Sequence, residues 1–380
     1  MATQRTENMT SFIAMDVLER AHDMERQGIH IIHLEVGEPD SPTPLCVNRA
    51  VIKALEEGDT HYTHSLGMIE LREAICEHYL RQYGVAITPD RVVVTSGTSP
   101  AMLSLFAVLV EEGDEVILSD PHYACYPNFI RFFGGKPVMI RTHEEDGFQL
   151  NIDEVRKNLS ERTKAIFINS PSNPTGTLLP KENLEAIAAC GKTVISDEIY
   201  HGLVYEGKEH SILEFTDNAF VLNGFSKLHA MTGLRLGYLI APKDAMRPLQ
   251  KVQQNFFISA NAMVQKAGIV ALKETKKDTD MMRETYNKRR VYMVDRLKGM
   301  GFKIPVTPTG AFYVFVNARH ISKDSYKLAF DILEKAHVGV TPGIDFGDGG
   351  EGFLRFSYAN SLENIEEGMN RLERYLAAIS

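Results

Sequence analysis

The middle of the chain alternates short apolar runs with longer helical or loop segments. From Arg91 onward these runs read RVVVT, EVILS, PVMI, KAIFIN, TVIS, FVLN and LGYLIA. Each run is rich in β-branched residues and continuously apolar, which is typical of strands that are covered on both faces. The pattern therefore predicts an α/β fold, in which a mostly parallel, seven-stranded sheet is flanked by helices.

The two ends of the chain show a different pattern. An amphipathic helix is predicted near the N-terminus and another behind a Ser361 cap at the C-terminus, from apolar residues at helical spacing: Ile13, Val17, Ala21 and Met24, and then Ile365, Met369, Leu372 and Leu376. After Ala241, charged helical stretches are followed by the strand-like segments GAFYVFVN and GFLRFSYA. We predict a large domain of residues 46–285 and a smaller α+β domain of residues 1–45 and 286–380.

Composition narrows the function classes. The 380 residues carry a net charge of −9 and no block of Lys or Arg, which argues against a nucleic-acid partner. The four cysteines form no CxxC pair, so neither a disulfide framework nor a zinc site is indicated. No segment reads as a signal peptide or a membrane span, and a cytoplasmic location is expected.

The loops that follow the apolar runs carry most of the candidate chemistry. Ligands of open α/β sheets bind beyond the carboxyl ends of the strands, and five such ends lead into polar loops. Gly97, Thr98 and Ser99 precede an apolar helix, whose free amides would suit a phosphate, although an ordinary helix cap is the alternative. The usual GxGxxG and GxxxxGK[ST] nucleotide signatures are absent there, so the phosphate would belong to another kind of ligand.

Three further loops supply a carboxylate, an amide and a lysine. Asp197, directly after TVIS, could hold a proton on a heteroaromatic nitrogen or could cap the next segment. Asn173 in SPSNPTG is either a ligand-binding amide or a turn former. Lys227 in GFSK could form an imine with a carbonyl, while Ser226 and Arg235 clamp a phosphate; the alternative is a surface lysine.

Taken together, SPSNPTG, SDEIY and SKLHAMTGLRLGY resemble the class I/II aminotransferases, the fold-type I enzymes that use pyridoxal 5′-phosphate. The three motifs occur in the same order as in that family, and the resemblance extends from HLEVGEPD to LRFSYAN. It implies a Schiff base on Lys227, a pyridine-nitrogen partner in Asp197 and a homodimer. It also implies roles for other residues: Asn173 and Tyr200 at the ring hydroxyl; Gly97, Thr98, Ser99, Ser226 and Arg235 at the phosphate; Tyr123 stacked on the ring, with Tyr126 as the alternative; Tyr62 at the neighbouring subunit's phosphate; Gly37, Asn173 and Arg355 at the substrate carboxylate.

The activity implied by this resemblance is ping-pong transfer of an amino group from an L-α-amino acid to a 2-oxo acid. A carbon–sulfur β-lyase would share every cofactor residue, whereas an effector module would need a DNA-binding domain, and GFSKL is one glycine short of a hydrolase elbow. The helix from Ser99 to Val110 carries no cation, so strict aspartate specificity is not expected. Phe12, Ile13 and the HSLG loop predict an apolar side-chain pocket; the alternative is that Arg20, Lys251 or a residue of a neighbouring subunit enters it. No metal is expected, because none of the thirteen histidines, including His61 and His64, has partners at ligand-like spacing.

Overall fold

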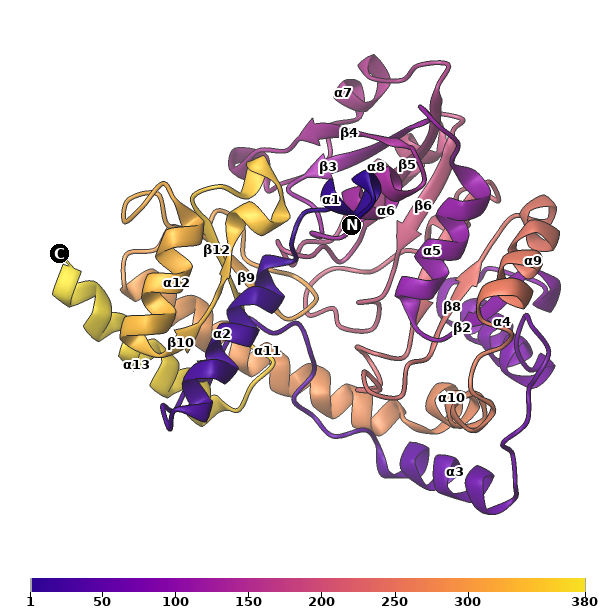
Figure 1. Ribbon diagram of the computed structural model, residues 1–380, viewed down its shortest axis with the longest axis horizontal. Helices are drawn as coiled ribbons and strands as arrows, with labels where there is room; N and C mark the ends of the chain where they lie inside the picture. The colour runs from indigo at the N-terminus through magenta and orange to yellow at the C-terminus, as the bar shows by residue number, and fades with distance from the viewer. Residues whose placement is uncertain (1, 380) are drawn as a thin grey trace.

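A computed structural model describes residues 2–379, which form a large seven-stranded sheet and a smaller part with a three-stranded sheet (Figure 1). The large sheet has the order β2 (Val92–Thr95), β8 (Gly237–Ile240), β7 (Ala219–Gly224), β6 (Thr193–Asp197), β5 (Thr163–Asn169), β3 (Glu115–Asp120) and β4 (Lys136–Arg141). Strand β8 runs antiparallel to both of its neighbours, β2 and β7, and all other pairs in this sheet are parallel. All seven predicted strands are present, and the predicted α/β class is confirmed.

Both faces of the large sheet are buried. Along β3, Ile117 belongs to the apolar cluster on one face, while Val116 and Leu118 belong to the cluster on the other. Successive side chains of a strand point to opposite faces, so a strand that is covered twice has no polar face to present. This is why the apolar runs in the sequence are continuous.

Helices cover the two faces. One face packs against α3 (Leu45–Glu56), α4 (Ile69–Tyr83), α7 (Ile152–Lys157), α8 (Lys181–Ala188) and α10 (Ala262–Glu274), and the other against α5 (Thr98–Leu109), α6 (Tyr126–Phe132) and α9 (Met246–Phe256). The described chain also contains six short 3₁₀ turns: Pro89–Arg91, Glu144–Asp146, Ile212–Glu214, Lys243–Ala245, Gly343–Phe346 and Asp348–Gly350.

The smaller part contains two short sheets and four helices. Strands β11 (Thr341–Pro342), β12 (Phe353–Ser357) and β9 (Tyr313–Asn317) are antiparallel, and β1 (Ile32–His33) pairs in parallel with β10 (Val338–Gly339). Around them lie α2 (Ile13–Arg26), α11 (Lys276–Gly299), α12 (Ser325–Ala336) and α13 (Leu362–Ile379). The two predicted terminal helices are confirmed as α2 and α13, and the Ser361 hydroxyl accepts a hydrogen bond from the amide of Asn364 at 3.1 Å.

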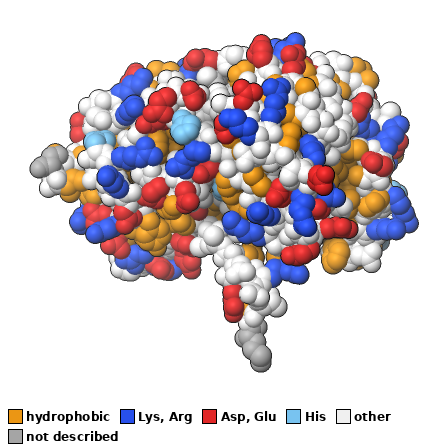
Figure 2. Space-filling view, turned by 90° about the horizontal axis from the view of Figure 1, so that it is seen from above, with side chains coloured by type: hydrophobic (Ala, Val, Ile, Leu, Met, Phe, Trp, Pro, Cys, Tyr) orange, Lys and Arg blue, Asp and Glu red, His pale blue; other side chains and the backbone are white. Residues whose placement is uncertain are grey.

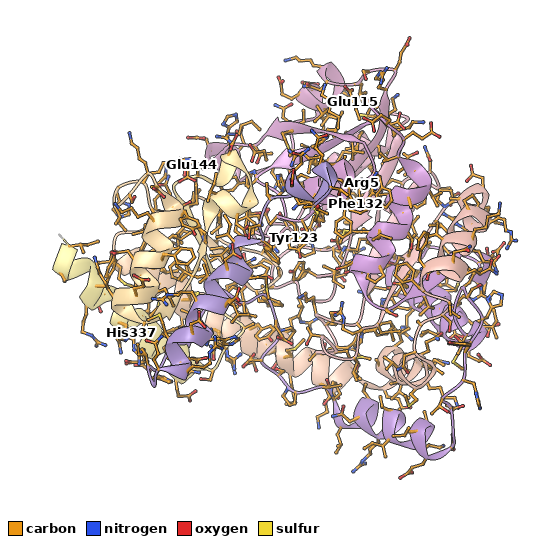
Figure 3. All side chains as sticks on the ribbon, in the orientation of Figure 1. Arg5, Glu115, Tyr123, Phe132, Glu144 and His337 are labelled. Atoms are coloured by element: carbon orange, nitrogen blue, oxygen red, sulfur yellow. The ribbon has the colours of Figure 1, made fainter. Side chains whose placement is uncertain are left out.

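The two parts of the chain are connected more extensively than the predicted domain boundaries imply. Helix α11 runs without a break through residues 285 and 286, where the predicted boundary falls. At the N-terminus, α1 (Gln4–Glu7) lies against α6 of the large part, with the Arg5 guanidinium 5.1 Å from the ring centre of Phe132 (Figure 3). The division into residues 46–285 and the two flanking segments stays a prediction.

The surface is mixed in charge. On the face shown in Figure 2, acidic and basic side chains are interspersed, and the N-terminal segment projects from the body. Among the described helices, none combines the length and apolarity that crossing a bilayer requires. The four cysteines are free thiols.

Candidate active site

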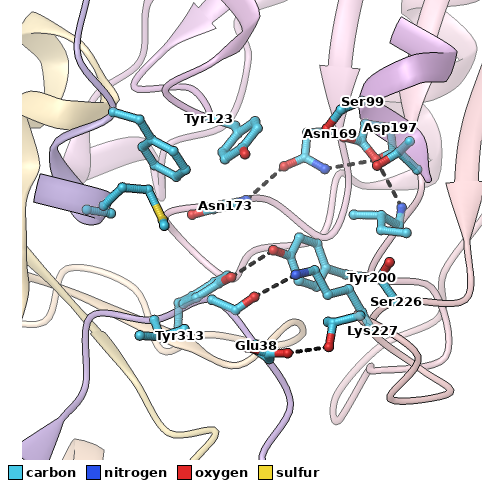
Figure 4. Close-up of a pocket in the computed structure, with 18 of the residues that line it drawn as sticks. Glu38, Ser99, Tyr123, Asn169, Asn173, Asp197, Tyr200, Ser226, Lys227 and Tyr313 are labelled. Carbon is cyan, nitrogen blue, oxygen red and sulfur yellow. Dashed lines mark hydrogen bonds between the residues drawn. The ribbon is translucent and has the colours of Figure 1, made fainter. Parts of the chain in front are cut away.

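A cavity of about 350 Å³ lies where the carboxyl ends of the parallel strands face the smaller part (Figure 4). Loops that follow β2, β3, β5, β6 and β7 all reach it, so the five polar loops converge as expected. Its lining includes all the predicted site residues except Gly97 and Tyr62: Gly37, Thr98, Ser99, Tyr123, Asn173, Asp197, Tyr200, Ser226, Lys227, Arg235 and Arg355.

One end of the cavity is suited to an anion. Helix α5 begins at Thr98 beside the cavity, and no side chain caps its N-terminus. Gly97 has φ +102°, and a Cβ on it would lie 2.6 Å from an Arg235 guanidinium nitrogen, so only glycine lets the arginine approach the helix. Uncapped amides, the helix dipole and a guanidinium at one place favour a bound anion such as phosphate.

The segment from Ser226 to Arg235 is held in an unusual backbone conformation. Ala230 and Arg235 have φ of 49° and 54°, in the left-handed region that costs free energy for residues other than glycine. Arg235 donates to the main-chain oxygen of Thr232 at 2.8 Å, which fixes the guanidinium at the anion end. Pro100 occupies the first turn of α5, where its missing N–H removes no helical hydrogen bond, and Ser99 still lines the cavity.

Asp197 is a buried carboxylate at the end of β6. One of its oxygens accepts from the Tyr126 hydroxyl at 2.7 Å and the other from the amide of Ile199 at 3.1 Å. Burial outweighs these hydrogen bonds and raises the pKa of Asp197 from 3.8 to about 6. Tyr126, the alternative stacking residue, is therefore a hydrogen-bond partner of Asp197, and both Tyr123 and Tyr126 line the cavity.

Replacing this carboxylate is expected to stabilise the cofactor-free chain. The folded-state pKa lies above the unfolded value, so the contribution of Asp197 to stability is full below pH 4 and is lost as the pH rises through 6. We expect Asp197→Asn to raise the free energy of unfolding by about 3 kcal/mol at pH 8, with the gain vanishing toward pH 4. Denaturant unfolding at both pH values measures this, and an equal loss of stability at both would contradict it.

Lys227 projects into the centre of the cavity from the loop after β7. Its ammonium donates to the main-chain oxygen of Gly37 at 2.5 Å. Burial lowers the pKa of Lys227 from 10.5 to about 8, helped by the nearby positive charges of Arg355 and Arg235, while Glu38 and Asp197 oppose the shift. A lysine in this state has a sizeable neutral fraction near neutral pH and can act as a nucleophile or a base.

A hydrogen-bonded network connects the loops around Lys227. The Asn169 side chain donates to the main-chain oxygen of Asp197 at 2.9 Å and accepts from the amide of Asn173 at 2.8 Å. On the other side, the Tyr200 and Tyr313 hydroxyls are 2.8 Å apart. A Cβ on Gly37 would lie 2.5 Å from the Tyr313 hydroxyl, so Gly37 provides room for that ring.

Arg355 is a buried guanidinium whose protein contacts are all with uncharged groups. It is 2% exposed and donates to Oδ1 of Asn173 at 2.9 Å, the main-chain oxygen of Glu35 at 2.5 Å and the Thr341 hydroxyl at 3.0 Å. Its Nε is buried without a hydrogen-bond partner, and its plane lies 4.3 Å from the centre of the Tyr313 ring. A buried cation with an unused donor favours a ligand carboxylate in the cavity.

The wall opposite the large sheet comes from α2. Met15 and Leu18 line the cavity from this helix and Phe12 from the residue before it, whereas Ile13 and the HSLG loop are not in the lining. The helix is fixed by Asp345, whose two carboxylate oxygens accept from the amides of Ile13 at 2.8 Å and Ala14 at 3.1 Å. This capping places an apolar surface next to Lys227 and Arg355.

Several lining residues were not predicted from the sequence, among them Asn169, Tyr313 and Glu38. Asn169 carried a usable signal, because it is the last residue of β5, beside the loop that contains Asn173. Tyr62 lies outside the cavity lining and is 81% exposed, and Gly97 lies behind Arg235. The roles of the predicted site residues stay predictions.

Comparison with known proteins agrees with this fold and site. The sequence profile described as aminotransferase class I and II matches residues 29–372. A (5-formylfuran-3-yl)methyl phosphate transaminase of Methanocaldococcus jannaschii is 42% identical, covering 99% of this chain and 100% of that protein. An aspartate aminotransferase of Pyrococcus horikoshii is 40% identical over 95% of this chain and 93% of its own length. The structure of a Thermus thermophilus aspartate aminotransferase with maleate superposes with a TM-score of 0.95 at 37% identity, covering 98% of this chain and 99% of that one.

The fold and the site therefore define a transferase of amino groups. The chain belongs to the class I and II aminotransferases. The resemblance noted in the sequence and the predicted transaminase activity are confirmed, and the alternative of a β-lyase is not favoured.

Proposed function

We propose that this aminotransferase uses pyridoxal 5′-phosphate, held by the residues that the sequence predicted. The residues present fit this group. A buried carboxylate, Asp197, lies at one end of the cavity, and an uncapped helix with Ser226 and Arg235 lies at the other, with Lys227 between them. Tyr123 would stack on the ring, and Tyr200 and Asn173 would face its hydroxyl.

Asp197, Lys227 and Arg355 would each have a different role in the reaction. When bound, pyridoxal phosphate supplies an electron-withdrawing ring that stabilises negative charge at the α-carbon of an amino acid. Asp197 would keep a proton on the ring nitrogen, because its carboxylate is buried and lacks a cationic hydrogen-bond partner. Lys227 would remove and return the α-proton, a task suited to an amine whose pKa is about 8. Arg355 would bind the substrate α-carboxylate and orient the α-carbon.

The observation that carries this proposal is the placement of Lys227 between two buried charged groups, Asp197 and Arg355, with all three open to the same cavity. A surface lysine, the alternative considered from the sequence, does not agree with the position of Lys227 in the cavity lining. The substrates would be an L-α-amino acid and a 2-oxo acid.

We further infer a preference for substrates with apolar side chains. The only cations lining the cavity within the described chain are Lys227, Arg235 and Arg355, and each already has a proposed task. A second substrate carboxylate would lose water beside Phe12, Met15 and Leu18 without gaining a partner. Leucine or phenylalanine should therefore exceed aspartate in kcat/KM by about tenfold or more.

A panel of amino donors with a fixed 2-oxo acid tests both the activity and this preference. Release of ammonia is followed alongside amino transfer, with and without the oxo acid. Transfer that requires the oxo acid supports the transaminase, whereas ammonia formed without an acceptor would indicate a lyase. A tenfold preference for aspartate would contradict the apolar pocket.

A homodimer and a cytoplasmic location complete the proposal. Tyr62 is a large aromatic residue that is 81% exposed and lies outside its own chain's cavity lining, which supports a place in a neighbouring subunit's site. Four free cysteines support a reducing compartment.

A further inference from the structure

A second group of potential ligands lies at the far end of α2, apart from the cavity lining. Nitrogen and oxygen atoms of His22, Glu25 and His33 all lie within 4.8 Å of one another. Nε2 of His33 is 3.1 Å from Oε1 of Glu25, and the rings of His22 and His33 have their centres 5.8 Å apart. Two imidazoles and a carboxylate form a donor set that suits Zn²⁺.

The backbone brings these three side chains together in a defined way. His22 and Glu25 are three residues apart on α2 and so share one face of the helix. The neighbouring face of the helix is buried through Val17, Ala21 and Met24. His33 belongs to β1, which pairs with β10 and is thereby held beside the helix.

The strongest support comes from Glu35, behind His33. This glutamate is fully buried, and its Oε1 lies 2.6 Å from Nδ1 of His33. A Cβ on Gly339 would lie 2.0 Å from Oε2 of Glu35, so a glycine makes room for the carboxylate. A buried carboxylate that holds one imidazole nitrogen and leaves the other facing outward is the arrangement that orients metal-binding histidines in proteins.

The spacing is also compatible with tetrahedral coordination. Two ligand atoms on one Zn²⁺, each about 2.1 Å from the ion, lie about 3.4 Å apart. The 3.1 Å between His33 and Glu25 is close to this value, and His22 is within reach. Three protein ligands leave a fourth position for water, in keeping with the partly exposed side chains of Glu25 and His33, at 39% and 24%.

We propose that His22, Glu25 and His33 form a binding site for one Zn²⁺ ion, oriented by Glu35. The bound ion would tie α2 to β1. Both elements lead toward the active-site cavity, since α2 carries its apolar wall and the main-chain oxygen of Glu35 accepts from Arg355. The ion would thus stabilise the smaller part of the molecule. This inference opposes the prediction from the sequence that no histidine binds a metal.

Calorimetric titration of Zn²⁺ into the full-length, tag-free, cofactor-loaded protein tests the site. We expect one ion per chain, a higher unfolding temperature with Zn²⁺, and a loss of affinity of at least tenfold in both His22→Ala and Glu25→Gln. These two side chains are exposed, so the variants should fold normally. Glu35→Gln should weaken binding by about 10-fold to 100-fold.

The matched control is the double variant His61→Ala with His64→Ala, which removes another exposed histidine pair three residues apart. It should bind Zn²⁺ as the unmodified protein does. Equal affinity in the unmodified protein and in His22→Ala, or a greater loss in the His61 and His64 control, would overturn the proposal. The cluster would then be an ion pair of His33 with two glutamates.

Discussion

Lys227→Ala should abolish amino transfer, with kcat reduced by about 10⁴-fold or more. Lys227 is the only lysine lining the cavity within the described chain, and its depressed pKa suits both of its proposed tasks. Removing it would take away the covalent link to the cofactor and the base at the α-carbon together. Steady-state rates with the best amino donor, and the visible absorbance of the purified variant, measure these losses.

Two further variants separate the amine from its charge. Lys227→Arg keeps a cation but cannot serve as the amine, so it should be as inactive as the alanine variant. Lys251→Ala removes an exposed lysine and should leave the rate unchanged. Activity within tenfold of the unmodified enzyme in Lys227→Ala would show that another group performs the chemistry.

Arg355→Gln should lower kcat/KM for amino acids by about 10²-fold to 10³-fold, chiefly through a higher KM. The guanidinium is buried among uncharged partners, and it is the only buried cation among the described lining residues, so a substrate carboxylate would find its counter-charge there. Losing one member of a buried, hydrogen-bonded charge pair costs about 2–5 kcal/mol, which corresponds to a loss of this size. Kinetics with a series of amino-acid concentrations measure it.

An amine that lacks the carboxylate provides the sharpest comparison. The unmodified enzyme should strongly prefer an amino acid over the matching alkylamine, and Arg355→Gln should lose most of that preference. Arg319→Gln, which removes a partly exposed guanidinium stacked on Phe353, serves as the control and should retain the preference. If Arg355→Gln keeps an unchanged KM, the carboxylate binds elsewhere.

The sequence predicted the structure best where a residue's local pattern also reflects its place in the folded protein. Six buried strands and the partly exposed edge strand β4 correspond to the seven apolar runs, because both faces of the sheet are covered away from that edge. Asp197 is the last residue of β6 and Lys227 follows the end of β7 by three residues, so the rule that ligands bind at carboxyl ends was enough to bring them together. Resemblance to the family then supplied the roles that the residue types alone left open.

Contacts between segments that are distant in the sequence could be predicted less well from its pattern. Tyr313 begins strand β9 in the smaller part and reaches the cavity because that part packs against the large sheet. Strands β1, β10 and β11 contain two residues each, too few for any periodicity to show. The cluster at His33 joins a helix to a strand through Glu25, and its members have none of the regular spacing of a metal motif.

The central claim is that Lys227 carries pyridoxal phosphate and that amino acids convert it. The most direct measurement is the absorbance spectrum of the purified, cofactor-loaded protein, alone and after addition of single amino acids, with Lys227→Ala in parallel. We expect a visible band from cofactor linked to the lysine, which an amino acid shifts to that of the aminated cofactor and a 2-oxo acid restores. Absence of the band after added cofactor, or the same shift in Lys227→Ala at an unchanged rate, would contradict the assignment.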